Sequence, residues 1–182
     1  MWTLPNLLTL ARALSGLPIA VLALAGWWLP AFALFVAAAA TDWLDGYIAR
    51  SRGQVSDFGR FLDPIADKLM VAAALVALVA ERAIAGWAVI AVVLILVREL
   101  TVSGLREYLA PKGVTVHVSG LAKWKTAAQL VACSALLLGV ARPELWRLPV
   151  AEIGQAALWV AAALTLWTGL EYLRGGMRHM AT

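Results

Sequence analysis

Charged residues are scarce in this sequence. Only 14% of the 182 residues are charged and 63% are hydrophobic, and the mean hydropathy is +0.83. A soluble domain carries about 25% charged residues, and a chain of this length cannot bury such an apolar excess in one core. The composition therefore excludes a water-soluble globule and a disordered chain, and it predicts an integral membrane protein.

Cysteine is almost absent too. The single cysteine, Cys133, excludes a disulfide framework and a multi-cysteine zinc site, and its Ala and Leu neighbours indicate a small buried residue. The net charge of +4 is small. In a membrane protein, such a basic excess more often encodes orientation and attraction to anionic lipid than nucleic-acid binding. We therefore expect membrane lipids, and no nucleic acid, as partners.

Six apolar stretches approach the length that a helix needs to cross a bilayer. Short segments marked by Gly, Pro and charge connect them, and no linker separates two domains. We therefore expect residues 1–182 to form one all-α integral membrane domain, a bundle of six transmembrane helices. The stretches are Leu14–Leu29, Ala31–Ile48, Leu62–Ala80, Ala85–Thr101, Ala122–Ala141 and Ile153–Leu173.

The first dozen residues are less apolar than a span and include Pro5, Asn6, Thr9 and Arg12. They predict a short amphipathic helix that lies on the membrane surface before the first span. Asn6 and Thr9 either border a pocket or cap this surface helix.

Basic residues predict the orientation of the six spans. Both termini share a side with the loops after the second and fourth spans. That side collects all of the 15 Lys and Arg residues except Arg82, Arg142 and Arg147. By the positive-inside rule, this side faces the cytoplasm. We therefore expect a multi-pass protein of the cytoplasmic membrane with both termini inside.

Four aspartates lie in or beside the apolar spans, where an ionised carboxylate is costly unless it is compensated. Asp42 and Asp45 are three residues apart, and Asp63 and Asp67 are four apart, so each pair projects from one helix face. A short loop joins the two helices, so we expect antiparallel neighbours whose four carboxylates converge at the cytoplasmic end. No His or Cys accompanies them, which favours hard divalent cations, Mg²⁺ first, with Mn²⁺ or Ca²⁺ as alternatives.

Four carboxylates suit a pair of ions, the arrangement used for in-line displacement at phosphorus. They therefore predict a phosphate-bearing substrate. Small residues nearby, Gly46, Ala49 and Gly59, either leave room for that ligand or allow tight helix packing. Arg50 could grip a phosphate with two hydrogen bonds, or extend to the membrane interface.

These residues form a recognisable pattern. Asp42-x-x-Asp45-Gly46-x-x-Ala49-Arg50, eight further residues, and then Gly59-x-x-x-Asp63-x-x-x-Asp67 resembles the signature of the CDP-alcohol phosphotransferase family at every position. The resemblance implies a six-span, often homodimeric membrane enzyme. Such an enzyme moves a phosphatidyl group from a CDP-linked lipid to an alcohol and releases CMP.

The resemblance also implies a role for each signature residue. The metal ligands would be Asp42, Asp45, Asp63 and Asp67, and Asp67 would in addition be the base for the attacking hydroxyl. The cytidine diphosphate of the lipid would be lined by Gly46, Ala49, Arg50, Gly59 and Asp63.

Outside the signature, the chain is similar to family members that use CDP-diacylglycerol and sn-glycerol 3-phosphate. The similarity includes Pro5-Asn6-x-x-Thr9-x-x-Arg12 and stretches around residues 62–68, 98–107 and 123–129. A dianionic acceptor beside a pyrophosphate needs several cations. Four basic residues at the ends of the fourth and fifth spans could supply them, or could contact lipid headgroups instead: Arg98, Arg106, Lys123 and Lys125.

Two alternatives stay open from the sequence. A family member could use another acceptor and make cardiolipin, phosphatidylinositol phosphate or phosphatidylserine. The acids could instead line a divalent-cation channel or transporter. That alternative predicts acidic residues along the whole path, whereas these lie at one end.

Overall fold

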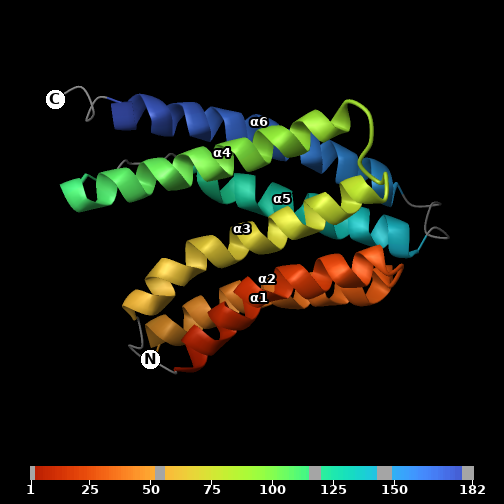
Figure 1. Cartoon of the computed structure of the whole chain (residues 1–182), viewed down its shortest axis with the longest axis horizontal. Helices are drawn as coiled ribbons and strands as arrows, with labels where there is room; N and C mark the ends of the chain where they lie inside the picture. The colour runs from red at the N-terminus through yellow and green to blue at the C-terminus, as the bar shows by residue number, and fades with distance from the viewer. Residues whose placement is uncertain (1–2, 52–55, 115–119, 143–148, 178–182) are drawn as a thin grey trace.

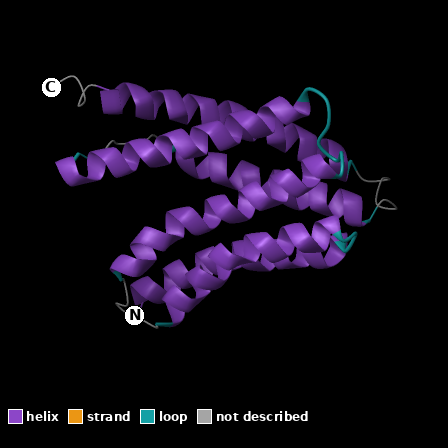
Figure 2. Ribbon diagram, in the orientation of Figure 1, coloured by secondary structure: helices purple, strands orange, loops and turns teal. Residues whose placement is uncertain are grey.

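The computed structural model describes residues 3–51, 56–114, 120–142 and 149–177, without the side chains of residues 42–47, 49–51 and 60. These ranges are helical and contain no strand (Figure 2), which confirms the all-α prediction. The elements are α1 (Leu4–Leu24), α2 (Trp28–Ser51), α3 (Asp57–Ala80), α4 (Ala88–Leu109), the 3₁₀ helix η1 (Ala110–Lys112), α5 (Leu121–Ala141) and α6 (Val150–Met177).

The helices form two groups (Figure 1). In the first group α1 packs against both α2 and α3, and α2 and α3 touch each other only slightly. In the second group α6 packs against α4 and α5. α5 also contacts α2 and α3, and so connects the groups. α3 and α4 meet over a small area and diverge toward the end of the molecule where α1 begins and α6 ends (Figure 1).

Long apolar helices fit a multi-pass membrane protein. Four helical segments in the described ranges have the length and composition to cross a bilayer, and the described apolar part of α2, Trp28–Thr41, is shorter. Large apolar side chains such as Leu17, Trp87 and Leu100 are exposed on the outside of the bundle. Exposed apolar surface of this extent is unfavourable in water and favourable in lipid. The count of six spans stays a prediction.

The separate surface helix expected over residues 1–12 is not confirmed, because Leu4–Leu24 form one continuous helix. Pro5 stands in its first turn, where a missing N–H costs little. Asn6, Thr9 and Arg12 are buried. Their polar face packs against α3, as the contacts described below show.

The hydrophobic core and the buried polar side chains occupy different ends of the bundle. Ile19, Phe35, Leu78, Ile95 and Leu137 belong to one apolar cluster, which reaches the ends of α1 and α3. Gly16 allows α1 and α3 to approach closely there, since a Cβ atom at this position would lie 3.0 Å from the carbonyl oxygen of Leu69. The opposite end carries buried polar side chains from several helices, and it is the candidate site.

Candidate active site

The beginning of α3 is fixed against α1 by a short polar chain. Ser56 caps α3, because its Oγ accepts a hydrogen bond from the Gly59 N–H at 3.0 Å. The same Oγ donates to Asn6 Oδ1 at 2.7 Å. A Cβ at Gly59 would come within 3.1 Å of Asn6 Oδ1, so glycine lets α1 approach α3 closely here. Asn6, expected at the border of a pocket, thus contacts the start of α3.

Asp63 and Asp67 project from α3 toward α1, as their spacing of four residues predicts. Asp63 Oδ1 accepts hydrogen bonds from Thr9 Oγ1 at 2.8 Å and from Arg12 Nη2 at 3.2 Å. Arg12 Nε lies 3.3 Å from Asp67 Oδ1. The Arg12 side chain is 0% exposed, whereas those of Asp63 and Asp67 are 48% and 35% exposed. One buried cation therefore serves two carboxylates that a ligand can still reach.

This role of Arg12 was not predicted from the sequence, which indicated a surface helix. A signal was present, because Asn6, Thr9 and Arg12 recur every three residues and share one helix face. The spacing shows a common face, but it does not identify the helix that the face contacts.

The other signature residues lie on α2. Asp42, Asp45, Gly46, Ala49 and Arg50 fall within the helical backbone of α2, but their side chains lie outside the described residues. Their metal and nucleotide roles therefore stay predictions.

The donor chemistry on α3 fits a hard divalent cation. Within the described residues no three His, Cys, Asp or Glu side chains gather into a metal-sized group. Asp63 and Asp67 nevertheless present two carboxylates with hard oxygen donors, which Mg²⁺ and Mn²⁺ prefer. The remaining ligands are expected from α2.

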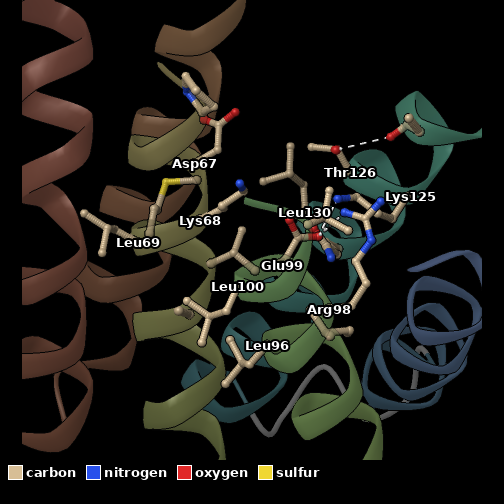
Figure 3. Close-up of a pocket in the computed structure, with 18 of the residues that line it drawn as sticks. Asp67, Lys68, Leu69, Leu96, Arg98, Glu99, Leu100, Lys125, Thr126 and Leu130 are labelled. Atoms are coloured by element: carbon tan, nitrogen blue, oxygen red, sulfur yellow. Dashed lines mark hydrogen bonds and ion pairs between the residues drawn. The ribbon is translucent and has the colours of Figure 1, made fainter. Parts of the chain in front are cut away.

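A cavity of about 480 Å³ lies between α3, α4 and α5, with Ala39 of α2 and Tyr172 of α6 in its wall. Its apolar wall includes Leu69, Leu96, Leu100 and Leu130 (Figure 3). Its polar lining consists of Asp67, Lys68, Arg98, Glu99, Arg106, Lys125, Thr126 and Gln129. Three of the four cations predicted to bind the acceptor, Arg98, Arg106 and Lys125, therefore line the same cavity as Asp67.

Glu99 connects the cations in this cavity. It accepts a hydrogen bond from Arg98 Nη1 at 3.3 Å and another from Lys125 Nζ, and it is 8% exposed (Figure 3). Lys68 of α3 donates to Ser103 Oγ of α4, which in turn donates to the Glu99 carbonyl at 2.8 Å. Four basic groups, Lys68, Arg98, Arg106 and Lys125, line the cavity against two acids, Asp67 and Glu99. The cavity suits an anion.

Lys123 is placed differently from the other predicted cations. Its side chain is exposed and does not line the cavity, whereas Lys125 is buried in the lining. Residues two apart on a helix do not face the same way. The glycerol-phosphate role of Lys123 therefore stays a prediction without support from the cavity.

The family model for CDP-alcohol phosphatidyltransferase matches residues 2–167, which include both acids of α3 and most of the cavity. The chain belongs to this family. As a CDP-alcohol phosphatidyltransferase it is a membrane transferase, and the predicted family resemblance is confirmed.

Bacterial relatives of this phosphatidyltransferase cover nearly its whole length. The relative from Cereibacter sphaeroides is 39% identical over 98% of this chain and 97% of its own. The relative from Pectobacterium atrosepticum is 46% identical over 98% and 96%, and that from Escherichia coli is 43% identical over 94% and 93%. All three are named CDP-diacylglycerol--glycerol-3-phosphate 3-phosphatidyltransferase.

Proposed function

We propose that the protein transfers the phosphatidyl group of CDP-diacylglycerol to sn-glycerol 3-phosphate, giving phosphatidylglycerophosphate and CMP. The observation that carries the proposal is one cavity whose lining includes both Asp67 and three cations, Arg98, Arg106 and Lys125. The names of the relatives support the donor and the acceptor. The reaction would serve phospholipid biosynthesis.

The donor's pyrophosphate would bind at the acids of α2 and α3. Asp42, Asp45, Asp63 and Asp67 would hold divalent cations, Mg²⁺ or Mn²⁺, in a two-ion site. When bound, these ions polarise the pyrophosphate and offset the negative charge of the leaving CMP. Among the described residues, Thr9 and Arg12 orient Asp63, and Arg12 also orients Asp67. Partners of this kind tune ligand orientation and basicity.

The remaining signature residues would bind the nucleotide. We assign Gly46, Ala49, Arg50, Gly59 and Asp63 to the cytidine diphosphate of the lipid. The space that a side chain at Gly59 would take is filled by Asn6, whose Oδ1 would lie 3.1 Å from a Cβ there, so the nucleotide role of Gly59 rests on the family signature. Asn6 and Thr9 would then border the pocket.

The acceptor would be held by its phosphate and activated at its hydroxyl. Arg98, Arg106 and Lys125 would bind the phosphate dianion through charge-assisted hydrogen bonds. Asp67 would take the proton of the attacking hydroxyl, whose oxygen then bonds to the lipid-side phosphorus as the bond to CMP breaks. Positioned general bases of this kind contribute about 10²–10⁴ in rate.

The apolar wall of the cavity would receive the acyl chains of the donor. Leu69 of α3 and Leu100 of α4 are half-exposed or more, 50% and 75%, and both line the cavity. α3 and α4 meet over only a small area. Lipid could therefore enter sideways between α3 and α4, while soluble acceptor enters from the aqueous end.

The membrane arrangement is also proposed. Six spans, a bacterial cytoplasmic membrane, and both termini and the active site on the cytoplasmic side agree with the distribution of Lys and Arg. The start of α1 and the end of α6 lie at one end of the molecule, as an even number of spans requires (Figure 1). A homodimer is expected from the family resemblance.

CMP release by the purified protein in detergent tests the proposal. The donor is CDP-diacylglycerol, and glycerol 3-phosphate, inositol phosphate, serine and phosphatidylglycerol are each offered as acceptor, with Mg²⁺ or with a chelator. We expect CMP release only with glycerol 3-phosphate and Mg²⁺. Turnover with another acceptor alone, or Mg²⁺ flux into sealed vesicles without CMP release, would contradict the proposal.

A further inference from the structure

The side chain of Arg98 is held on two sides by α6. Its Nη2 donates a hydrogen bond to Thr168 Oγ1 at 3.0 Å, and Thr168 is fully buried. The Thr168 hydroxyl donates its own proton to the Leu164 carbonyl at 2.8 Å. A hydroxyl has a single proton to donate. The backbone of α6 therefore orients Thr168 so that a lone pair faces Arg98.

Gly169, the next residue of α6, makes room for the aliphatic stem of Arg98. A Cβ atom at Gly169 would lie 2.7 Å from Arg98 Cγ and 3.3 Å from its Nε, closer than side chains can pack. Cγ is near the backbone end of the side chain. A shift there rotates the whole side chain and displaces the guanidinium, so it is not a small adjustment at a flexible tip.

Glu99 holds the remaining side of the guanidinium through Nη1 at 3.3 Å, and it also pairs with Lys125. The two terminal nitrogens of arginine carry four N–H groups. The contacts that Arg98 makes among the described residues use one proton on each of them. The other terminal protons can still reach an anion in the cavity, which Arg98 lines.

We propose that Thr168 and Gly169 form a slot on α6 that positions Arg98 for the phosphate of the acceptor, which makes both of them positioning residues. The inference rests on the proposed function, because it assumes a phosphorylated acceptor in this cavity. Its physical basis is preorganisation: a guanidinium already fixed in its binding geometry loses less side-chain entropy when the phosphate arrives.

Gly169→Ala tests the slot by steady-state kinetics. We expect the apparent KM for glycerol 3-phosphate to rise about tenfold, the effect of about 1.4 kcal/mol, while the KM for CDP-diacylglycerol changes by less than about twofold. The matched control is Gly154→Ala in the first turns of α6, whose Cβ would lie 2.7 Å from Leu136 Cγ, outside the cavity lining. This control should lower the melting temperature without changing the ratio of the two KM values. Equal changes for both substrates in Gly169→Ala would overturn the proposal.

Thr168 provides a second, conservative pair of variants. Thr168→Val removes the acceptor of the Arg98 hydrogen bond and should raise the KM for glycerol 3-phosphate. Thr168→Ser keeps the hydroxyl, so its KM for glycerol 3-phosphate should stay near the wild-type value. A Thr168→Ser variant as impaired as Thr168→Val would contradict the assignment.

A double-mutant cycle shows whether the slot acts through Arg98. Once Arg98→Ala has removed the guanidinium, Gly169→Ala should have no further effect on the KM for the acceptor. Independent, additive effects would overturn the proposal. The wild type in the same assay separates the two proposals. Absence of CMP release with glycerol 3-phosphate contradicts the proposed reaction, whereas a normal wild type with an unaltered Gly169→Ala variant contradicts only the slot.

Discussion

Arg12 on α1 and Asp67 on α3 are joined by an ion pair, with Arg12 Nε 3.3 Å from Asp67 Oδ1, and the same guanidinium donates to Asp63. Two like charges four residues apart on a helix destabilise it. A buried cation beside both acids offsets that repulsion and fixes the direction in which they point. The acids of α3 are therefore arranged by α1 as well as by their own helix.

Arg12→Lys should weaken the metal site while the charge is kept. A lysine ammonium lacks the planar fork that lets arginine meet two carboxylates at once. Loss of a group that orients metal ligands typically costs about 10- to 100-fold in metal affinity or activity. Titration of CMP release with Mg²⁺ measures the effect, and Arg82→Lys, an exposed residue of the α3–α4 turn, is the control. An unchanged Mg²⁺ requirement in Arg12→Lys would contradict the role of Arg12.

Asp67→Asn should abolish most turnover and leave part of the binding of CDP-diacylglycerol. An amide cannot take a proton from the acceptor, so we expect a loss of about 10²–10⁴ in kcat. Single-turnover kinetics and a separate lipid-binding measurement divide chemistry from binding. Asp57→Asn makes the same chemical change at an exposed residue outside the cavity and should retain activity. Normal turnover in Asp67→Asn would remove its role as base.

Arg106→Ala should raise the KM for glycerol 3-phosphate more than that for the lipid. Arg106 lines the cavity, and loss of one charge-assisted contact to phosphate corresponds to about tenfold in affinity. Lys123→Ala is the natural comparison, since Lys123 is an exposed cation outside the cavity lining and should have little effect. Equal changes in both KM values for Arg106→Ala would indicate a lipid-headgroup role.

Glu99→Gln should destabilise the protein. Glu99 is nearly buried and pairs with Arg98 and Lys125, so its neutralisation leaves two buried cations without their counter-charge. Breaking such a pair costs about 3–5 kcal/mol. In the Glu99→Gln variant, adding Lys125→Met should recover part of the lost stability, because it removes one of the two cations that have no counter-charge. It should not recover activity. Thermal unfolding in detergent measures both, and a Glu99→Gln variant as stable as the wild type would rule out this account.

Local features of the chain were predictable from the sequence. The spacing of four residues between Asp63 and Asp67 predicts a common face, and both acids do contact Arg12. The prediction that Lys123 and Lys125 share one binding site overlooked the same local geometry, because two residues along a helix turn the side chain away from the face that carries Lys125. Periodicity is a property of one helix, so one sequence suffices to see it.

Partners across helices were not predictable in the same way. The buried polar face of Asn6, Thr9 and Arg12 has the same pattern as a helix on a membrane surface, and only packing shows that it faces α3. Thr168 was missed for the same reason: on α6 it is one polar residue in an apolar helix until Arg98 of α4 is placed beside it.

The two helix groups divide the proposed donor site from the proposed acceptor site. The acids of α3 and their supporting residues are on α1 and α3, whereas the cations of the cavity, apart from Lys68, are on α4 and α5, and α6 holds one of them, Arg98. Substitutions on α4 to α6 can therefore change the acceptor alcohol while the acids of α3 and their partners on α1 keep their role in the reaction.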